Sequence, residues 1–199
     1  MRVIAGEKGG RRLQAPPGRE TRPTADRVRE AAFSILESHV ALDGVKVWDL
    51  FAGSGALGIE ALSRGAAHAT FIDHARTAIS VTKANLARLG YDAARANVAC
   101  ADVLRWVHGV DPEDLSDMVT AKPVGEVDLV LADPPYAWQS WPALLEGLAR
   151  LAPLVLMETA EEPQLPEAWD VVRAKRYGGT LVTLARLHAT GDDLRGDEL

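Results

Sequence analysis

Cysteine is nearly absent from this chain, which has one, Cys100, among 199 residues. A single thiol excludes an internal disulfide framework and a metal site built from several cysteines, and it is typical of a reducing compartment. Long apolar runs are also missing. No stretch approaches the ~18 residues that a membrane span needs, and the first ten residues lack the apolar core of a signal peptide. We therefore expect a cytoplasmic protein that does not insert into a membrane. No metal is expected, because the histidines are scattered: His39, His68, His74, His108 and His188.

Positive charge is also scarce, since 22 Lys and Arg face 28 Asp and Glu and the net charge is −6. The deficit is uneven along the chain. Residues 1–30 carry eight basic and four acidic side chains, which makes this segment +4 and the remainder −10. A basic segment on an acidic body indicates contact with phosphate groups. The alternative is a solvated basic surface. The candidates for phosphate contacts are Arg11, Arg12, Arg19 and Arg22.

Apolar periodicity predicts alternating strands and helices. A short hairpin is expected over residues 1–14 and a helix over residues 25–37. The predicted strands are 45–50, 69–73, 97–100, 127–132 and 154–157, and the predicted helices are 57–64, 75–89, 103–108 and 141–151. Residues 169–176 and 180–187 are expected to form an antiparallel hairpin.

This alternation predicts an α/β fold: a doubly wound, mostly parallel sheet of seven strands with a C-terminal antiparallel hairpin and a small N-terminal extension of hairpin and helix. The expected domains are a basic hairpin arm over residues 1–22, a main domain over residues 23–189 and an acidic flexible tail over residues 190–199. Residues 111–126 are polar and contain two prolines and a glycine, so we expect a surface loop, to which no role is assigned.

A glycine-rich turn follows the first predicted strand. Gly53, Gly55 and Gly58 have the G-x-G-x-x-G spacing, which lets the backbone turn sharply and approach a ligand closely. The helix that follows presents free N–H groups to an anion. Asp73 ends the next predicted strand, where a carboxylate can accept hydrogen bonds from two ribose hydroxyls. The turn therefore predicts a nucleotide-type cofactor, either NAD or an adenosyl compound.

Two further carboxylates favour the adenosyl compound. Asp49 precedes the glycines and can face the ammonium group of a methionine moiety, whereas its charge would gain nothing beside a pyrophosphate. Asp102, just past the third predicted strand, can accept a hydrogen bond from an adenine amine. Each has a structural alternative, since Asp102 can cap a helix and Asp49 can bond to the turn.

The corner after the predicted strand 127–132 carries the most specific signal. It reads Asp133, Pro134, Pro135 and Tyr136. Two consecutive prolines have no backbone N–H, so the corner presents only carbonyl acceptors, and Pro135 holds Pro134 in the extended region. An acidic side chain before the prolines and an aromatic ring after them suit a planar group with an exocyclic NH₂, such as a nucleobase amine. A strand-ending turn with a packed tyrosine is the alternative.

Three sequence segments occur together with this corner and with Asp73. They are Arg22-Pro23-Thr24-Ala25-Asp26-Arg27-Val28-Arg29-Glu30, the turn 49–58 and Glu60-Ala61-Leu62-Ser63-Arg64-Gly65-Ala66. The combination resembles the RsmD family from about residue 2 to residue 187. These are bacterial class I S-adenosylmethionine-dependent methyltransferases, with a Rossmann-like sheet, that modify the exocyclic N2 of a guanine in 16S ribosomal RNA of the small subunit.

This resemblance implies a role for each candidate residue. The methionine end of the cofactor would be held by Asp49, Ala52, Gly53, Ser54 and Gly55, the ribose by Asp73 and the adenine edge by Asp102. The target base would be held by Asp133, Pro134 and Tyr136. The RNA-binding residues would be Arg11, Arg12, Arg19 and Arg22. The expected partner is 16S rRNA within a small subunit or an assembly intermediate, and the protein is expected to act as a monomer.

Three other readings of the same residues stay open. An adenine-N6 DNA methyltransferase uses a similar corner, but the chain lacks an obvious target-recognition domain. A nucleotide-binding module without catalysis would not need Asp133 and Tyr136. A protein-glutamine methyltransferase usually carries Asn where this corner has Asp133.

Overall fold

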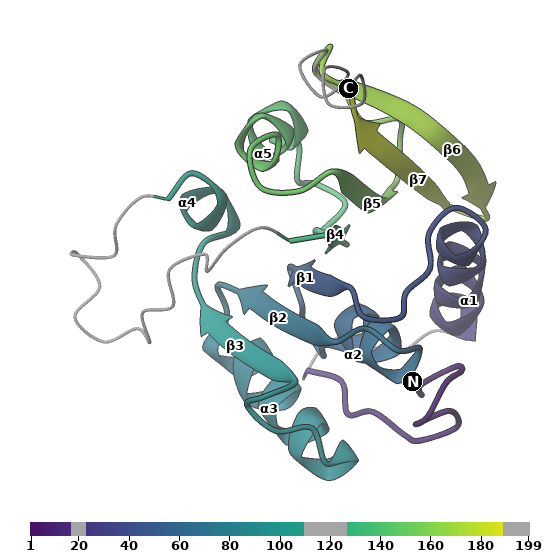
Figure 1. Cartoon of the computed structure of the whole chain (residues 1–199), viewed down its shortest axis with the longest axis vertical. Coiled ribbons are helices and arrows are strands. Elements are labelled where there is room, and N and C mark those ends of the chain that lie inside the picture. Colours follow the sequence, from purple (N-terminus) through teal and green to yellow (C-terminus); the bar gives the residue numbers. More distant parts are fainter. Residues whose placement is uncertain (17–22, 110–126, 189–199) are drawn as a thin grey trace, which may run out of the picture.

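The computed structural model describes residues 1–16, 23–109 and 127–188. Arg19, Arg22, the predicted loop 111–126 and the predicted tail 190–199 lie outside these ranges. Within the described residues, seven strands form one sheet in the order β3-β2-β1-β4-β5-β7-β6 (Figure 1). Five are parallel to one another: β1 (Lys46–Leu50), β2 (His68–Asp73), β3 (Ala96–Cys100), β4 (Leu129–Ala132) and β5 (Leu154–Thr159). The antiparallel pair is β6 (Trp169–Tyr177) and β7 (Thr180–Leu187). The predicted doubly wound sheet with its C-terminal hairpin is confirmed.

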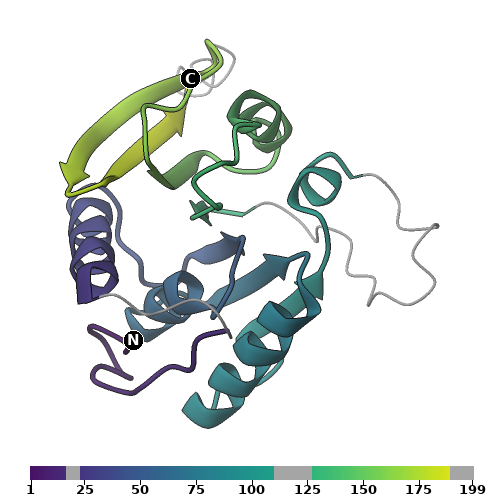
Figure 2. The same ribbon diagram turned by 180° about the vertical axis from the view of Figure 1, so that it is seen from behind.

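The helices cover both faces of the sheet (Figures 1 and 2). They are α1 (Pro23–Glu37), α2 (Ala56–Ser63), α3 (Arg76–Leu89), α4 (Val103–Val107) and α5 (Trp141–Leu148). One core cluster joins α1, α2 and α3 to one face, and a second joins α4 and α5 to the other. Successive residues of a strand enter different clusters, as the period of two requires: Val47 packs in the first, and Trp48 and Leu50 in the second.

Most predicted boundaries agree with the structure to within one or two residues, and the differences have local causes. Helix α1 begins at Pro23, two residues earlier than predicted, at the position where a proline without an N–H costs nothing. Strand β5 extends past the predicted residue 157, because Glu158 and Thr159 pair with Val182 and Leu181 of β7. Helix α5 ends at Leu148, three residues before the predicted end.

The N-terminal residues form the predicted hairpin, through a bridge between Arg2 and Arg12. Its apolar side chains, Val3 and Leu13, are buried in the same core cluster as α1 and α2. Gly6 makes the closest approach to α2, since a Cβ there would lie 1.8 Å from the carbonyl oxygen of Ser63. The hairpin is therefore packed on the main body of the protein and shares its core.

None of the helices in the described part of the chain is long and apolar enough to cross a lipid bilayer.

Candidate active site

The carboxyl ends of β1, β2, β4 and β5 meet at one edge of the sheet, where the candidate site lies. Asp49, Asp73 and Glu158 lie at the ends of three of these strands, and Asp133 directly follows the fourth. The register places Asp49 opposite Leu131 and Leu131 opposite Leu156. Because side chains alternate between the faces of a sheet, all four carboxylates are directed to the face that α1 and α2 cover. The edge therefore concentrates negative charge at one place.

Asp49 is buried, with 1% of its surface exposed, and its Oδ2 accepts a hydrogen bond of 2.8 Å from the backbone N–H of Gly58. Burial raises the pKa of Asp49 well above its usual value, the Gly58 N–H opposes this, and the charges of Asp133 and Asp73 add to the rise. The carboxylate thus connects the end of β1 to the first turn of α2. A positively charged ligand group beside it would relieve the repulsion.

The glycine-rich turn adopts the backbone conformation that its sequence predicts. Gly53 and Gly55 have positive φ angles, 58° and 78°, and so does Phe51, at 62°. Gly58 has a different function, because a Cβ there would lie 2.4 Å from the ring of Phe71 on β2. The third glycine of the motif therefore allows α2 to pack against the sheet.

Asp73 holds the turn from the neighbouring strand. Its Oδ2 accepts from the N–H of Gly53 at 2.9 Å, and its Oδ1 accepts from the N–H of Ala75 at 2.8 Å. On the other side of the turn, Asn85 of α3 donates to the carbonyl of Ser54 at 2.9 Å. Each carboxylate oxygen can accept a second hydrogen bond, so Asp73 still has lone pairs for ribose hydroxyls. Its cofactor role stays a prediction, as do those of Asp49, Ala52, Gly53, Ser54 and Gly55.

Asp102 caps α4, because its carboxylate accepts a hydrogen bond of 3.0 Å from the N–H of Arg105. The helix cap, which the sequence offers as the alternative role of Asp102, is therefore present. A cap uses one lone pair of the carboxylate and leaves others for an adenine amine. The adenine-binding role of Asp102 is not tested by the structure.

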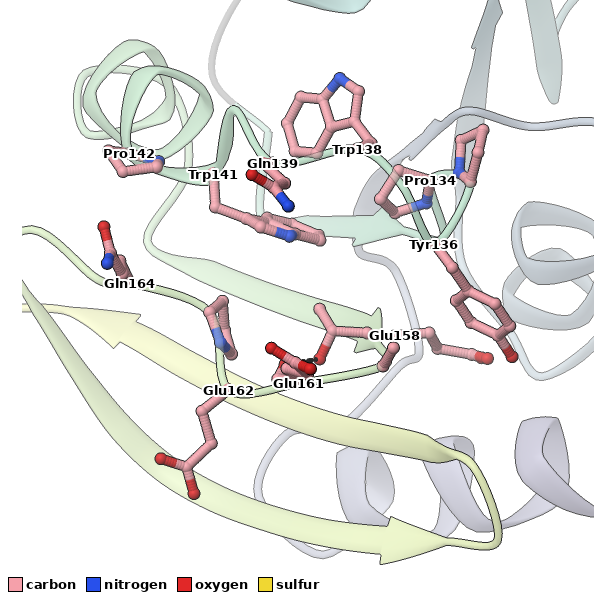
Figure 3. A pocket seen from close by; sticks show the side chains of 14 residues that line it. Pro134, Tyr136, Trp138, Gln139, Trp141, Pro142, Glu158, Glu161, Glu162 and Gln164 are labelled. Carbon is pink, nitrogen blue, oxygen red and sulfur yellow. Dashed lines mark hydrogen bonds between the residues drawn. The ribbon is translucent and has the colours of Figure 1, made fainter.

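The corner after β4 borders a cavity of about 400 Å³ (Figure 3). Pro134 is buried, whereas Tyr136 is 65% exposed and its hydroxyl lies 3.1 Å from Oγ1 of Thr180. This bond holds the phenol at its far end and leaves the ring accessible. Three aromatic residues connect the corner to the glycine-rich turn and to α5. The ring centroids of Phe51 and Trp138 lie 5.0 Å apart, as do those of Trp138 and Trp141.

Glu158 belongs to the same site, although sequence reasoning missed it. It lines the cavity with Pro134 and Tyr136 and is half-buried. Burial raises the pKa of Glu158 to about 8, with a further rise from Asp133 and a smaller one from Asp49, while Arg29 opposes. The sequence contains a signal for this residue, because Glu158 directly follows the apolar run 154–157. Since parallel strands end at the same edge of a sheet, this position predicts a carboxylate beside Asp133.

The structure describes two of the four basic residues that are expected to contact phosphate groups. Arg11 and Arg12 are exposed on the hairpin, and the other two candidates lie outside the described residues. Sequence reasoning also missed three exposed basic residues of the edge strand β6, Arg173, Lys175 and Arg176. Arg176 donates to the carbonyl of Ala160 at 2.8 Å, which places it beside the cavity. The available signal was the presence of three basic residues within four positions of the predicted hairpin.

Among residues 1–16, 23–109 and 127–188, the structure brings together no group of three His, Cys, Asp or Glu side chains that could hold a metal ion.

Comparisons with known proteins agree along nearly the whole chain. The family model described as conserved hypothetical protein 95 matches residues 1–186. YlbH of Bacillus subtilis (strain 168) is 38% identical over 192 residues, covering 92% of this chain and 97% of that protein. Ribosomal RNA small subunit methyltransferase D of Escherichia coli (strain K12) is 34% identical over 200 residues, covering 96% of this chain and 92% of that protein. The solved structure of yhhF from Escherichia coli has a TM-score of 0.77 and 32% identity, covering 96% of this chain and 99% of its own.

Proposed function

The chain belongs to the family described as conserved hypothetical protein 95, the RsmD family, and on this premise we propose that it transfers a methyl group from S-adenosylmethionine to the exocyclic N2 of a guanine in 16S rRNA. The observation that carries the proposal is the corner Asp133–Tyr136, an acceptor-rich rim with an accessible aromatic ring at the carboxyl edge of the sheet. The contact between Phe51 and Trp138 joins this corner to the glycine-rich turn.

The turn and its neighbouring carboxylates fit the proposed cofactor. S-adenosylmethionine supplies an electrophilic methyl group on a positively charged sulfur. The buried carboxylate of Asp49 suits the ammonium of the methionine moiety, and the remaining lone pairs of Asp73 and Asp102 suit the ribose and the adenine amine. The repulsion among the carboxylates at this edge favours a cationic ligand over the pyrophosphate of NAD.

The corner addresses the low reactivity of the target amine. The lone pair of an exocyclic amine on guanine is delocalised into the ring, so the amine is a weak nucleophile. Hydrogen bonds from the NH₂ group to the Asp133 carboxylate and the Pro134 carbonyl would localise that lone pair and aim it at the methyl group. Asp133 can then accept the proton that the nitrogen loses as the new bond forms. Aligning the two reactants is worth up to ~7–11 kcal/mol, and stacking on Tyr136 would contribute to it.

A methyl-transfer assay tests this function. Labelled S-adenosylmethionine is incubated with the protein and with unmodified small subunits, assembly intermediates or naked 16S rRNA, and the methylated nucleotide is mapped. We expect label in one guanine as N2-methylguanine. Absence of label from all three substrates would exclude the proposal, and label in adenine of a parallel DNA sample would favour the adenine-N6 alternative.

We expect Arg11 and Arg12 to contact the phosphate backbone. The double substitution Arg11→Ala and Arg12→Ala should raise KM for rRNA about 10-fold, leave kcat nearly unchanged and make binding less sensitive to salt, because two phosphate contacts are lost. The matched control is the double substitution Lys83→Ala and Arg88→Ala, which removes two exposed positive charges from α3. An equal rise in KM for the control would show that only the overall charge matters.

A further inference from the structure

We propose that Glu158 reads the Watson–Crick edge of the target base, accepting a hydrogen bond from guanine N1–H while the corner after β4 accepts from the neighbouring N2 amine. Glu158 would then be a specificity-determining residue that selects guanine over adenine-like bases. The inference rests on the proposed function and assigns a ligand atom to a carboxylate that the chemistry of methyl transfer does not use.

The geometry begins with the strand register. Strands β4 and β5 are parallel, and Ala132 lies opposite Met157. The next residue after β4 is Asp133, and the next residue within β5 is Glu158, so the two carboxylates follow paired positions of adjacent strands, which lie about 4.8 Å apart in a sheet. Burial raises the pKa of Glu158, and the charge of Asp133 raises it further, as expected of neighbouring carboxylates. Glu158 lines the same cavity as Pro134 and Tyr136, and Figure 3 shows its side chain directed toward Tyr136.

Guanine offers the matching pattern of donors. Its Watson–Crick edge carries N1–H directly beside the N2 amine, so two adjacent acceptors can bind both groups at once. Adenine carries an amine beside N1, but that N1 is an acceptor. Placing its lone pair against an ionised carboxylate leaves a charged acceptor without a donor and adds repulsion, which penalises the wrong base. The pair of carboxylates therefore fits guanine, whereas the corner alone accepts any nucleobase amine.

The charges around Glu158 make this selectivity dependent on pH. Asp133 after β4 and Asp49 on β1 disfavour a further negative charge, Arg29 on α1 favours it, and Tyr136 faces the same cavity. With burial, these groups bring the pKa of Glu158 to about 8. Below that pH the protonated acid can donate to a ring nitrogen, and above it the carboxylate can only accept. Guanine selectivity should therefore rise with pH.

The test compares two bases that both carry the reactive 2-amino group. After the target guanine has been mapped, the substrate RNA is prepared with guanine or with 2-aminopurine at that position, because 2-aminopurine has an acceptor at N1. The parent enzyme should prefer guanine in kcat/KM by ~10–100-fold at about pH 8.5, and this ratio should fall at about pH 6.5. The substitution Glu158→Gln should bring the ratio to within about threefold at both pH values, because an amide can either accept or donate.

The control is Glu162→Gln, an exposed glutamate in the segment after β5 whose side chain points away from Tyr136 in Figure 3. This variant should keep the parent enzyme's ratio of kcat/KM for guanine to kcat/KM for 2-aminopurine at both pH values. The missing O6 of 2-aminopurine affects parent and variant alike, so the change in ratio reports the coupling between Glu158 and N1. If Glu158→Gln keeps the original ratio, or if the parent ratio does not change with pH, the inference is wrong although guanine methylation stands. Failure of the parent enzyme to methylate guanine would instead exclude the proposed function.

Discussion

Replacing Asp133 with alanine is expected to lower kcat for methyl transfer by ~10³-fold or more, while the affinity for S-adenosylmethionine changes less than about threefold. Asp133 directly follows β4 and directly precedes Pro134, which lines the cavity, and it is not part of the glycine-rich turn. In the proposed mechanism its carboxylate both orients the amine and accepts its proton. Alanine removes both functions but leaves the hydrogen bonds of Asp49 and Asp73 to the turn intact.

Single-turnover kinetics with labelled cofactor and calorimetric titration with S-adenosylhomocysteine separate the two effects. The matched control is Asp128→Ala, which removes an exposed carboxylate just before β4, where Oδ2 accepts from the N–H of Lys46 at 2.7 Å. Asp128 lies at the amino end of β4, whereas the candidate site lies at the carboxyl ends of the strands, so the control should keep kcat. If cofactor affinity falls as steeply as kcat in the Asp133 variant, the carboxylate acts on the cofactor and not on the base.

The sequence predicts the scaffold of this site well, because the relevant signals are local. Each parallel strand is a short apolar run, and Asp49, Asp73 and Asp133 come at or directly after the end of such a run. Parallel strands joined by helices end at one edge of the sheet, so these carboxylates had to meet there. The seven strands and the corner Asp133–Tyr136 could be predicted from the sequence for the same reason.

Long-range contacts explain what the sequence does not reveal. The sequence shows Glu158 directly after an apolar run, but only the pairing with Val182 of β7 shows that Glu158 continues strand β5. The spacing of Gly58 suggested close approach to a ligand, whereas its absent side chain makes room for Phe71, thirteen residues away. The hairpin of residues 1–14 has a polar, glycine-rich sequence, and only the tertiary structure shows Val3 and Leu13 in the core.

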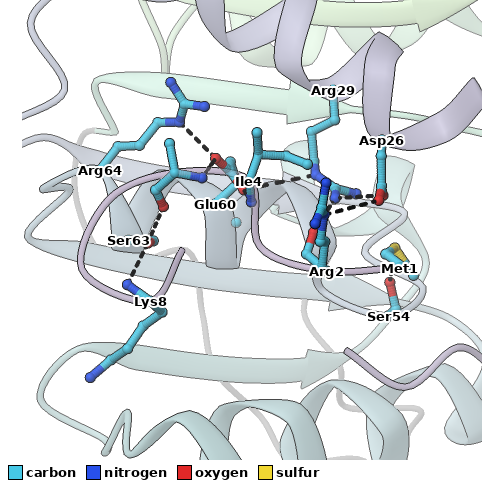
Figure 4. A network of polar contacts seen from close by, with 12 residues as sticks. Met1, Arg2, Ile4, Lys8, Asp26, Arg29, Ser54, Glu60, Ser63 and Arg64 are labelled. Atoms are coloured by element: carbon cyan, nitrogen blue, oxygen red, sulfur yellow. Dashed lines mark hydrogen bonds and ion pairs between the residues drawn. The ribbon is translucent and has the colours of Figure 1, made fainter. Parts of the chain in front are cut away.

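A buried carboxylate on α2 joins that hairpin to the main body (Figure 4). Glu60 is fully buried, and its two oxygens accept hydrogen bonds from the N–H groups of Ile4 at 2.7 Å and Ala5 at 3.0 Å. Oε1 also lies 2.7 Å from Nε of Arg64, and Oε2 lies 3.9 Å from Nε of Arg29. One side chain therefore satisfies two backbone donors and shares the charge compensation of Arg64 with Glu37 and that of Arg29 with Asp26.

The substitution Glu60→Ala is expected to lower the free energy of unfolding by about 3–5 kcal/mol, because it leaves two backbone N–H groups without their acceptor and removes a buried negative charge beside Arg29 and Arg64. For a chain of this length, such a loss corresponds to a fall in Tm of roughly 6–20 °C. Thermal and urea unfolding followed by circular dichroism would measure it. The hairpin should also become the first site of limited proteolysis, because its contacts with α2 depend on this carboxylate.

The matched control is Glu37→Ala, which removes the other carboxylate bound to Arg64, at 2.8 Å. Because Glu37 is exposed and Glu60 is not, the two variants delete ion pairs with the same arginine in different surroundings. A solvated pair contributes about 0–1 kcal/mol, so Glu37→Ala should shift Tm by no more than a few degrees. Equal losses in the two variants would mean that Arg64 alone matters and that Glu60 does not anchor the hairpin. A large loss confined to Glu60→Ala would show that the N-terminal hairpin is held in place by a buried charge on α2. Arg11 and Arg12 would then be presented from a fixed position on that hairpin.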